Sequence, residues 1–256
     1  MNEIEKYYNK FNEDKRLKSR HGIVEFTVTM ANIKKHLPNK SCKIIDIGAG
    51  TGRYADKLCA MGHNVVAVEL VQKNLSVLKQ NYPNIKAYKG NALNLNKFND
   101  EEFDVALLFG PMYHLFTKSD KLKALAEAKR VVKKGGLIFV CYLLADYAFI
   151  RHAIMDNYLK TSLNSGKIDD DFNIKTNEKD LYSYVKLGDI QELNKLSKLK
   201  RKAIFAPDGA TDYIRQSINK LSEDDFNVYI NYQLKNCERK DLLGASSHIV
   251  DVLIKQ

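Results

Sequence analysis

The sequence predicts an α/β protein in which helices cover both faces of a mainly parallel β-sheet. Short apolar runs that suit buried strands alternate with amphipathic segments of about 10–15 residues, the pattern of repeated strand–helix–strand units. The first of these runs leads straight into a glycine-rich loop. With 256 residues, 45% of them hydrophobic, the chain can bury a substantial core, and we expect one domain over residues 1–256.

The chain opens with an expected N-terminal helical cap over residues 1–40. Apolar residues recur there at helical spacing from Ile23 to Leu37, and Pro38 ends the pattern. The alternating part of the chain follows. We expect strands at 43–48, 64–70, 85–92, 103–109, 136–144, 202–206 and 248–254, and helices at 53–61, 72–82, 120–132, 188–199, 211–220 and 223–236.

Two segments interrupt this alternation. Residues 145–186 are polar and rich in tyrosine, and we interpret them as an inserted lid and not as a second core. Residues 207–246 form an expected helical insertion before the last strand.

Composition excludes several classes of protein. No apolar run approaches the roughly 18 residues of a membrane span, and the charged N-terminus has no secretory signal, so we expect no membrane partner. The four cysteines are scattered, with no C-x-x-C pair and no ligand-like histidine spacing. We therefore expect reduced thiols in a cytoplasmic protein, without a metal site or a disulfide framework.

A net charge of +10 raises the question of a nucleic-acid partner, since phosphate contacts need Lys and Arg. The excess is mostly lysine spread along the whole chain. The densest cluster, KLSKLKRK at 195–202, equally fits the solvated end of a helix. We expect a small-molecule partner and keep nucleic acid as the less favoured alternative.

The stretch DIGAGTG at residues 46–52 predicts a ligand-binding loop. Alternate glycines allow a tight turn at positive φ and admit a ligand against bare backbone, and the next helix points its N–H groups into that space. A dinucleotide fingerprint would place its third glycine one residue later, where Arg53 stands. An aspartate before the loop suits a ligand amine and would repel a pyrophosphate. The ligand-binding residues expected here are Asp46, Gly48, Ala49, Gly50, Gly52 and Tyr54.

Three more segments end at the same edge of the expected sheet, where open α/β sheets bind ligands. Glu69 closes the second strand, and its carboxylate can accept hydrogen bonds from both hydroxyls of a ribose. Asn91 closes the third strand, where a side-chain acceptor beside a free N–H can recognise an adenine edge. The fourth strand ends at Phe109 and Gly110. With Leu70 and Ala92, these residues complete the expected binding site.

Together these motifs resemble the class I S-adenosylmethionine-dependent methyltransferases. DIGAGTG resembles their first motif, VEL at 68–70 their second, GNA at 90–92 their adenine-side turn, and EAKRVVKKGGLIFV at 127–140 their helix and fifth strand. The chain is also similar to a bacterial group within that family. The group-specific segments are Gly-Pro-x-Tyr-His-Leu at 110–115, NEDKRLKSRHGIVEF at 12–26 and LLGASSHIV at 242–250.

This resemblance implies a Rossmann-like, seven-stranded mixed sheet in the order 3-2-1-4-5-7-6, with strand seven antiparallel. It also implies S-adenosylmethionine as cofactor and methyl transfer as the reaction, but it does not imply the acceptor. We expect the acceptor to be an oxygen, nitrogen or sulfur of a small molecule. The chain departs from the family in two places. Asn91 stands where many relatives carry aspartate, and residues 207–246 replace a short hairpin.

His114 and Tyr113 are the expected catalytic residues, because they follow the fourth strand beside the expected methyl group. His114 would face the acceptor and Tyr113 would line its pocket; the alternative is that His114 packs as a structural residue. A flap over the cofactor could come from Tyr7, Tyr8, Arg16, Arg20 and His21, with arginine meeting the ligand carboxylate; these residues could equally cap the sheet edge. Candidates for the acceptor pocket are Tyr142, Tyr147, Arg151, His152 and Tyr158, although aromatic residues at such spacing also suit a core.

Two other functions stay open. The first is an RNA methyltransferase acting on tRNA or rRNA. Against it, Phe-Gly-Pro-Met-Tyr at 109–113 differs from the Asn/Asp-Pro-Pro-Tyr/Phe of amino-group nucleic-acid enzymes, and no RNA-binding module is recognisable. The second is a protein that senses S-adenosylmethionine without turnover.

Overall fold

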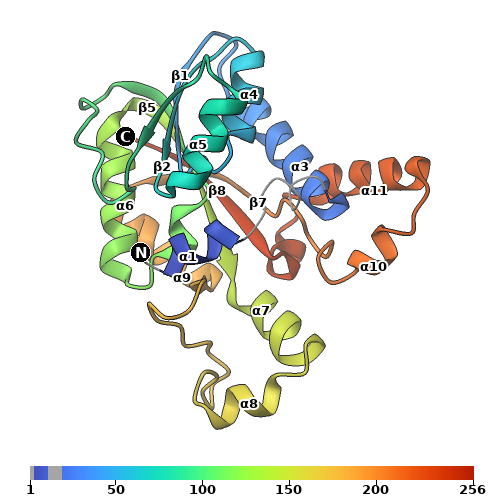
Figure 1. The fold of residues 1–256 in the computed structure, drawn as a ribbon. Helices are drawn as coiled ribbons and strands as arrows, with labels where there is room; N and C mark the ends of the chain where they lie inside the picture. The colour runs from blue at the N-terminus through green and yellow to red at the C-terminus, as the bar shows by residue number, and fades with distance from the viewer. Residues whose placement is uncertain (1–2, 11–18) are drawn as a thin grey trace.

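The structure, a computed structural model, describes residues 3–10 and 19–256, and its centre is a mixed β-sheet (Figure 1). Seven strands follow the order β3-β2-β1-β4-β5-β8-β7, and the short β6 pairs with the end of β5. Since β7 and β8 are the sixth and seventh expected strands, the order 3-2-1-4-5-7-6 is confirmed, and β6 is an unexpected addition. The strands are β1 (Lys43–Ile47), β2 (Asn64–Glu69), β3 (Lys86–Lys89), β4 (Phe103–Leu108), β5 (Val132–Leu144), β6 (Tyr184–Val185), β7 (Lys200–Phe205) and β8 (His248–Ile254).

The direction of the strands also agrees with the expectation. β1 pairs in parallel with β2 and β4, whereas β8 runs antiparallel between β5 and β7. Ile44, Ile45 and Ile47 of β1 are at most 1% exposed, because both faces of the parallel sheet are covered.

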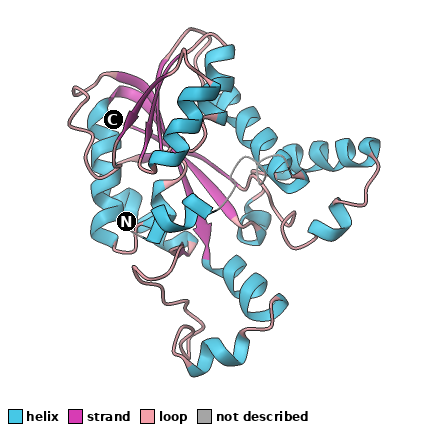
Figure 2. Cartoon of the chain, in the orientation of Figure 1, coloured by secondary structure: helices cyan, strands magenta, loops and turns pink. Residues whose placement is uncertain are grey.

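Helices cover the two faces (Figure 2). Side chains alternate between the faces of a strand, so Ile44 packs with one layer of helices and Ile45 with the other. The first layer contains α3 (Arg20–His36), α4 (Arg53–Ala60), α5 (Gln72–Asn81), α10 (Arg215–Ile218) and α11 (Glu223–Asn236). The second layer contains α6 (Lys118–Val131) and α9 (Leu187–Ser197). The shorter elements are α1 (Glu3–Lys10), η1 (Pro111–His114), α7 (Ala145–Ala148), η2 (Phe149–Met155), α8 (Leu159–Asn164) and η3 (Lys240–Ala245).

Local signals explain where the longer helices begin. Ser19, Thr117 and Ser222 precede α3, α6 and α11, and each side chain accepts a hydrogen bond from the backbone N–H three residues later. Each cap satisfies one of the N–H groups that a helix terminus leaves without a partner, which contributes about 1 kcal/mol.

The chain between β5 and α9 leaves the sheet. Its helices α7 and α8 project from the end of β5, away from the strands (Figure 1). The element η2 between them is a π-helix, a rare form that is frequent at functional sites. Within residues 3–10 and 19–256, no helix has the length and apolar character needed to cross a membrane.

Three expected elements were wrong in extent. The strand expected at 136–144 begins earlier, at Val132. The helix expected at 211–220 is reduced to α10, since the Thr211 hydroxyl donates to the Asp208 carbonyl and forms a local turn that competes with a helix. The strand expected at 85–92 stops at Lys89, because the Asn91 side chain accepts a hydrogen bond from Leu93 N and turns the chain.

Candidate cofactor and acceptor site

The glycine loop lies at the carboxyl end of β1. Gly48, Gly50 and Gly52 all have positive φ, at +80°, +56° and +93°, so the expected left-handed backbone is confirmed. The N–H groups of Gly48 and Ala49 donate to the Val68 carbonyl at 2.8 and 3.1 Å, which ties the loop to the end of β2.

The three glycines have different surroundings. A Cβ on Gly48 would lie 2.6 Å from Cδ of Pro111, and one on Gly52 would lie 2.7 Å from Cγ of Leu78. A Cβ on Gly50 would meet nothing within 4 Å. Close packing therefore requires the first and third glycines, whereas Gly50 presents bare backbone to open space.

This difference predicts distinct effects of alanine. In both variants the left-handed backbone should cost about 1–2 kcal/mol. Gly52→Ala should lose roughly a further 1–3 kcal/mol because the methyl group overpacks against Leu78, while Gly50→Ala should chiefly weaken nucleoside binding. Urea unfolding and calorimetric titration of both variants check this. Equal losses of stability would contradict the different surroundings.

Glu69 holds the loop at the end of β2. Its side chain is buried; Oε2 accepts from Gly50 N at 2.8 Å and Oε1 accepts from Val71 N at 2.7 Å. Burial raises the pKa of Glu69 above its usual value, although these hydrogen bonds oppose the shift. The carboxylate has lone pairs left to accept hydrogen bonds from sugar hydroxyls.

Asp46 ends up fully buried behind the loop. It is 1% exposed, and among the described residues its Oδ2 has no hydrogen-bond partner. Burial, and secondly the charge of Glu69, raise the pKa of Asp46 to about 7. A buried carboxylate oxygen without a partner is unfavourable, and a ligand ammonium group would satisfy it.

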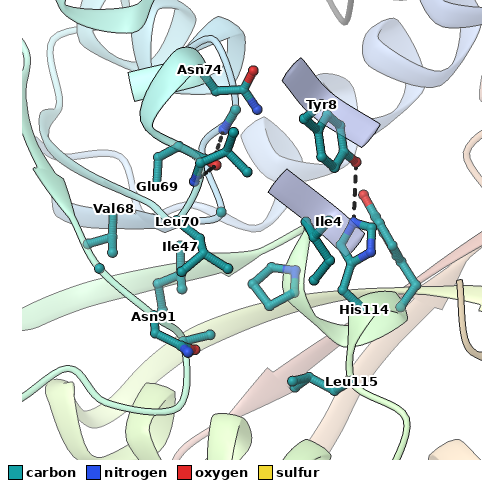
Figure 3. A pocket seen from close by; sticks show the side chains of 18 residues that line it. Ile4, Tyr8, Ile47, Val68, Glu69, Leu70, Asn74, Asn91, His114 and Leu115 are labelled. Atoms are coloured by element: carbon teal, nitrogen blue, oxygen red, sulfur yellow. Dashed lines mark hydrogen bonds between the residues drawn. The ribbon is translucent and has the colours of Figure 1, made fainter. Parts of the chain in front are cut away.

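Two adjoining cavities surround the loop. The first has a volume of about 210 Å³, and Figure 3 shows Glu69 and Leu70 on one side, Asn91 below them, and Ile4, Tyr8 and His114 opposite. The second, of about 70 Å³, contains the expected residues Asp46, Ala49, Tyr54 and Phe109. Gly48, Gly50, Gly110 and Tyr113 line both cavities. The pair suits an elongated ligand with a nucleoside at one end and an amine at the other.

Asn91 keeps the capacity expected of it. Its Oδ1 already accepts a hydrogen bond from Leu93 N at 3.0 Å, but an amide oxygen has a second lone pair for an adenine amino group. Ala92 lines the same cavity with its side chain buried.

Comparisons with known proteins agree with this geometry. A sequence profile described as a methyltransferase domain matches residues 45–140. The chain is 28% identical over 205 residues to a ubiquinone biosynthesis O-methyltransferase of Pelagibacter ubique, covering 78% of this chain and 77% of the relative. It is 36% identical over 99 residues to a demethylmenaquinone methyltransferase of Renibacterium salmoninarum, covering 38% and 40% of the two chains.

The fold has solved counterparts as well. The structure of an S-adenosylmethionine-dependent methyltransferase of Thermotoga maritima, a possible histamine N-methyltransferase, has a TM-score of 0.60, 19% identity, and 98% coverage of both chains. The profile and the named relatives support an S-adenosylmethionine-dependent methyltransferase, and the solved structure supports the class I fold. The partnerless Asp46 oxygen and the open face of Gly50 fit this cofactor.

The structure does not place Arg20 among the residues that line the first two cavities. Its guanidinium donates to the carbonyls of Ile218 and Leu221 at 2.9 and 2.6 Å and lies 4.8 Å from the ring centroid of Phe226. Arg20 thus fastens the α10–α11 segment of the methyltransferase to α3. Of the other expected flap residues, Arg16 lies outside the described residues, and Tyr7, Tyr8 and His21 border an adjacent cavity.

His114 lies in the wall of the first cavity, and both of its ring nitrogens form hydrogen bonds. Nδ1 lies 2.9 Å from the carbonyl oxygen of Leu181; since a carbonyl only accepts, Nδ1 carries the hydrogen. Nε2 lies 3.2 Å from the Tyr8 hydroxyl, which donates to it. Burial lowers the pKa of His114 to about 4. The ring is therefore neutral and links three segments of the methyltransferase, which favours the structural interpretation over catalysis.

A third cavity, of about 290 Å³, adjoins the first two, which we call the cofactor cavities. Tyr8 borders both it and the first cavity, and Tyr113 borders all three. Of the residues expected around the acceptor, Tyr147 and His152 line it. The other lining residues are Tyr7, His21, Glu25, Leu143, Tyr182, Tyr184, Asp208, Asp212, Arg215, Ser247 and His248.

Three residues expected at the acceptor lie outside this cavity. Tyr142 is 1% exposed within the core, Tyr158 is 59% exposed, and Arg151 forms ion pairs with Asp156 and, at 3.6 Å, with Asp212. Sequence reasoning missed Asp208, Tyr182 and His248. His248 belongs to the group-specific LLGASSHIV segment, which was the available signal; Asp208 and Tyr182 lie in segments without a motif.

Proposed function

We propose that this methyltransferase transfers the methyl group of S-adenosylmethionine to an oxygen, nitrogen or sulfur of a small molecule bound in the third cavity. The observation that carries the proposal is the position of Tyr113, which borders the acceptor cavity and both cofactor cavities. An acceptor that contacts the ring of Tyr113 from the third cavity would therefore lie next to both cofactor cavities. The relative named a ubiquinone biosynthesis O-methyltransferase supports a small-molecule acceptor.

In this reaction the residues of the chain align the methyl group of the cofactor with the acceptor. When bound, S-adenosylmethionine supplies an electrophilic methyl group on a positively charged sulfur. Asp46 would bind the amine, Glu69 the ribose hydroxyls and Asn91 the adenine edge, so three strand ends fix the direction of the methyl group. Such positioning can supply on the order of 7–11 kcal/mol of the barrier.

The segment 145–186 supports the proposal by its contribution to the acceptor cavity. Tyr147, His152, Tyr182 and Tyr184 all come from it and line that cavity. We propose that this segment serves as a lid that excludes water from the acceptor. A closed lid suits a small molecule better than a polymer.

The test is calorimetric titration with S-adenosylmethionine and S-adenosylhomocysteine, followed by a screen of phenols, amines and thiols for methyl uptake. We expect one binding site and turnover with at least one acceptor class. A chain that binds neither nucleoside would contradict the proposal. Binding without turnover on any acceptor would favour a sensor.

The net charge of +10 is the one observation that favours RNA as the acceptor. Within the basic cluster at 195–202, however, Arg201 is committed to the buried Asp251, at 2.7 and 2.8 Å. Binding of tRNA or rRNA that weakens steeply with added salt would revive the RNA alternative.

His114→Asn is expected to weaken cofactor binding more than it slows chemistry. The variant loses hydrogen bonds that join η1 to α1 and to Leu181, each contributing about 1 kcal/mol. Calorimetry and initial rates at saturating cofactor separate the two effects. A large fall in kcat with unchanged cofactor affinity would restore His114 as a catalytic residue.

A further inference from the structure

Asp208 and His248 form a buried hydrogen-bonded pair that the cofactor site does not use. His248 is the first residue of β8, and its Nδ1 lies 2.8 Å from Oδ2 of Asp208, in the loop after β7. Asp208 is 5% exposed, and its Oδ1 accepts from Ser246 Oγ at 2.9 Å and from His248 N at 3.3 Å. The Ser247 hydroxyl donates to Oδ2. Four donors thus converge on one carboxylate.

These contacts determine which nitrogen of the imidazole carries the hydrogen. Burial alone would raise the pKa of Asp208, but the charge of His248 and the hydrogen bonds from His248, Ser247 and Ser246 lower it below its usual value. An ionised carboxylate only accepts hydrogen bonds, so whenever the imidazole of His248 is neutral its hydrogen lies on Nδ1. The lone pair of this tautomer is then on Nε2, the arrangement of a general base oriented by a carboxylate.

Asp208 and His248 both line the third cavity, where the proposed acceptor binds. His248 pairs across the sheet with Leu143 at the end of β5, and both residues line the third cavity. The His248 ring lies 6.2 Å from the Tyr113 ring, centroid to centroid and nearly edge-on. Tyr113 in turn borders the cofactor cavities.

The other ionisable groups of the cavity are less suited to this task. Asp212 accepts from the Tyr147 hydroxyl at 2.5 Å and is paired with Arg215. His152 is half-exposed and pairs with Asp156 at 3.1 Å, and His21 lies 2.9 Å from the Ser19 hydroxyl. Glu25, on α3, is the remaining charged side chain that lines the cavity.

We propose that His248, oriented by Asp208, is the general base that accepts the proton of the acceptor nucleophile. The inference rests on the proposed function and narrows its acceptor to a small aromatic molecule with an un-ionised O–H or N–H group. Six tyrosines line the cavity, among them Tyr113 and Tyr182 with ring centroids 5.8 Å apart, and such rings favour a planar aromatic acceptor.

The step balances without a further reagent. The acceptor nucleophile forms a bond to the methyl carbon while the methyl–sulfur bond breaks, and the bonding electron pair stays on sulfur as a neutral thioether. The acceptor proton passes to Nε2 of His248. The positive charge of the sulfonium is thereby replaced by that of the imidazolium, which Asp208 stabilises.

The first experiment needs no acceptor. Long-range ¹H–¹⁵N spectra of the histidine rings, with His248→Asn for assignment, report the tautomer of His248 near neutral pH. We expect hydrogen on Nδ1 and a lone pair on Nε2, and a shift of this equilibrium in Asp208→Asn. Hydrogen on Nε2, or a permanently protonated ring, would overturn the proposal because Nε2 could not accept a proton.

The second experiment compares rates on phenol and on nitrophenols, which ionise without help near neutral pH. General-base catalysis contributes about 10²–10⁴-fold, so His248→Asn should slow phenol methylation by that factor and nitrophenol methylation much less. Added imidazole should restore part of the rate of His248→Ala. Asp208→Asn should also slow the methylation of phenol more than that of nitrophenols, since Asp208 positions the ring of His248. His63→Asn and Asp241→Asn, which lie away from this cavity, should match the wild type.

The outcomes separate the two proposals. Equal slowing of phenol and nitrophenol by His248→Asn, or rates within twofold of the wild type, would overturn the role of His248 while leaving methyl transfer intact. Absence of cofactor binding in the wild type would instead contradict the proposed function. If no probe is methylated, the tautomer measurement decides.

Discussion

Replacing Asp46 with asparagine is expected to stabilise the ligand-free methyltransferase above pH 7 while weakening its binding of S-adenosylmethionine. The pKa of Asp46 is about 7 in the folded chain, against an ordinary aspartate value of 3.8. The folded state therefore binds more protons than the unfolded state between these values, and stability falls as the pH rises through this window. Above pH 7 the penalty is on the order of 4 kcal/mol, and asparagine removes it.

The same variant should lose affinity because a ligand ammonium group no longer meets a carboxylate. A hydrogen bond to a charged group is worth roughly 1.5–3 kcal/mol, which corresponds to a loss of about 10- to 100-fold. Urea unfolding at pH 5 and pH 8, with calorimetry at pH 8, measures both effects. Asp241→Asn, an exposed carboxylate paired with Arg239, is the matched control. A stability difference between Asp46→Asn and wild type that does not grow from pH 5 to pH 8 would contradict the raised pKa.

Glu69→Ala is expected to lower both the stability of the protein and its affinity for the cofactor. Its effect on stability is thus opposite to that of Asp46→Asn, which should stabilise the protein. The substitution removes the acceptors of Gly50 N and Val71 N. Leaving a buried N–H without a partner costs about 1–3 kcal/mol, and the loop would lose its hydrogen bond from Gly50 to the end of β2. Because the sugar would also lose its acceptor, we expect calorimetry to detect no binding at cofactor concentrations that saturate the wild type.

Glu69→Gln provides the matched comparison for this prediction. Glutamine keeps one carbonyl oxygen of nearly the same position, so the variant should retain part of the loop's hydrogen bonding and more stability than Glu69→Ala. Wild-type affinity in Glu69→Ala would show that the sugar is bound elsewhere. An unchanged free energy of unfolding would show that Glu69 does not hold the loop.

Sequence reasoning succeeded where the signal is local. DIGAGTG carries its own conformational information, because three alternate glycines demand positive φ, and Glu69 was placed by the strand that ends at it. Asn91 follows β3, which ends earlier than expected, at Lys89. The Rossmann-like order was implied by resemblance and is now confirmed.

It failed where partners are distant along the chain. The guanidinium of Arg20, which was expected at the cofactor, bonds to residues about two hundred positions away, and no local pattern reveals these contacts. The Asp208–His248 pair joins residues forty positions apart across an irregular insertion. The two-residue β6 likewise depends on a tertiary contact, its pairing with the end of β5.

The packing of Gly48 on Pro111 and of Gly52 on Leu78 has a further consequence. Neighbouring side chains hold the loop in shape before any nucleoside arrives, so association need not order this backbone and little conformational entropy is lost there. Free and loaded forms of the enzyme should therefore share one loop conformation, and any rearrangement during turnover should fall on other parts of the chain.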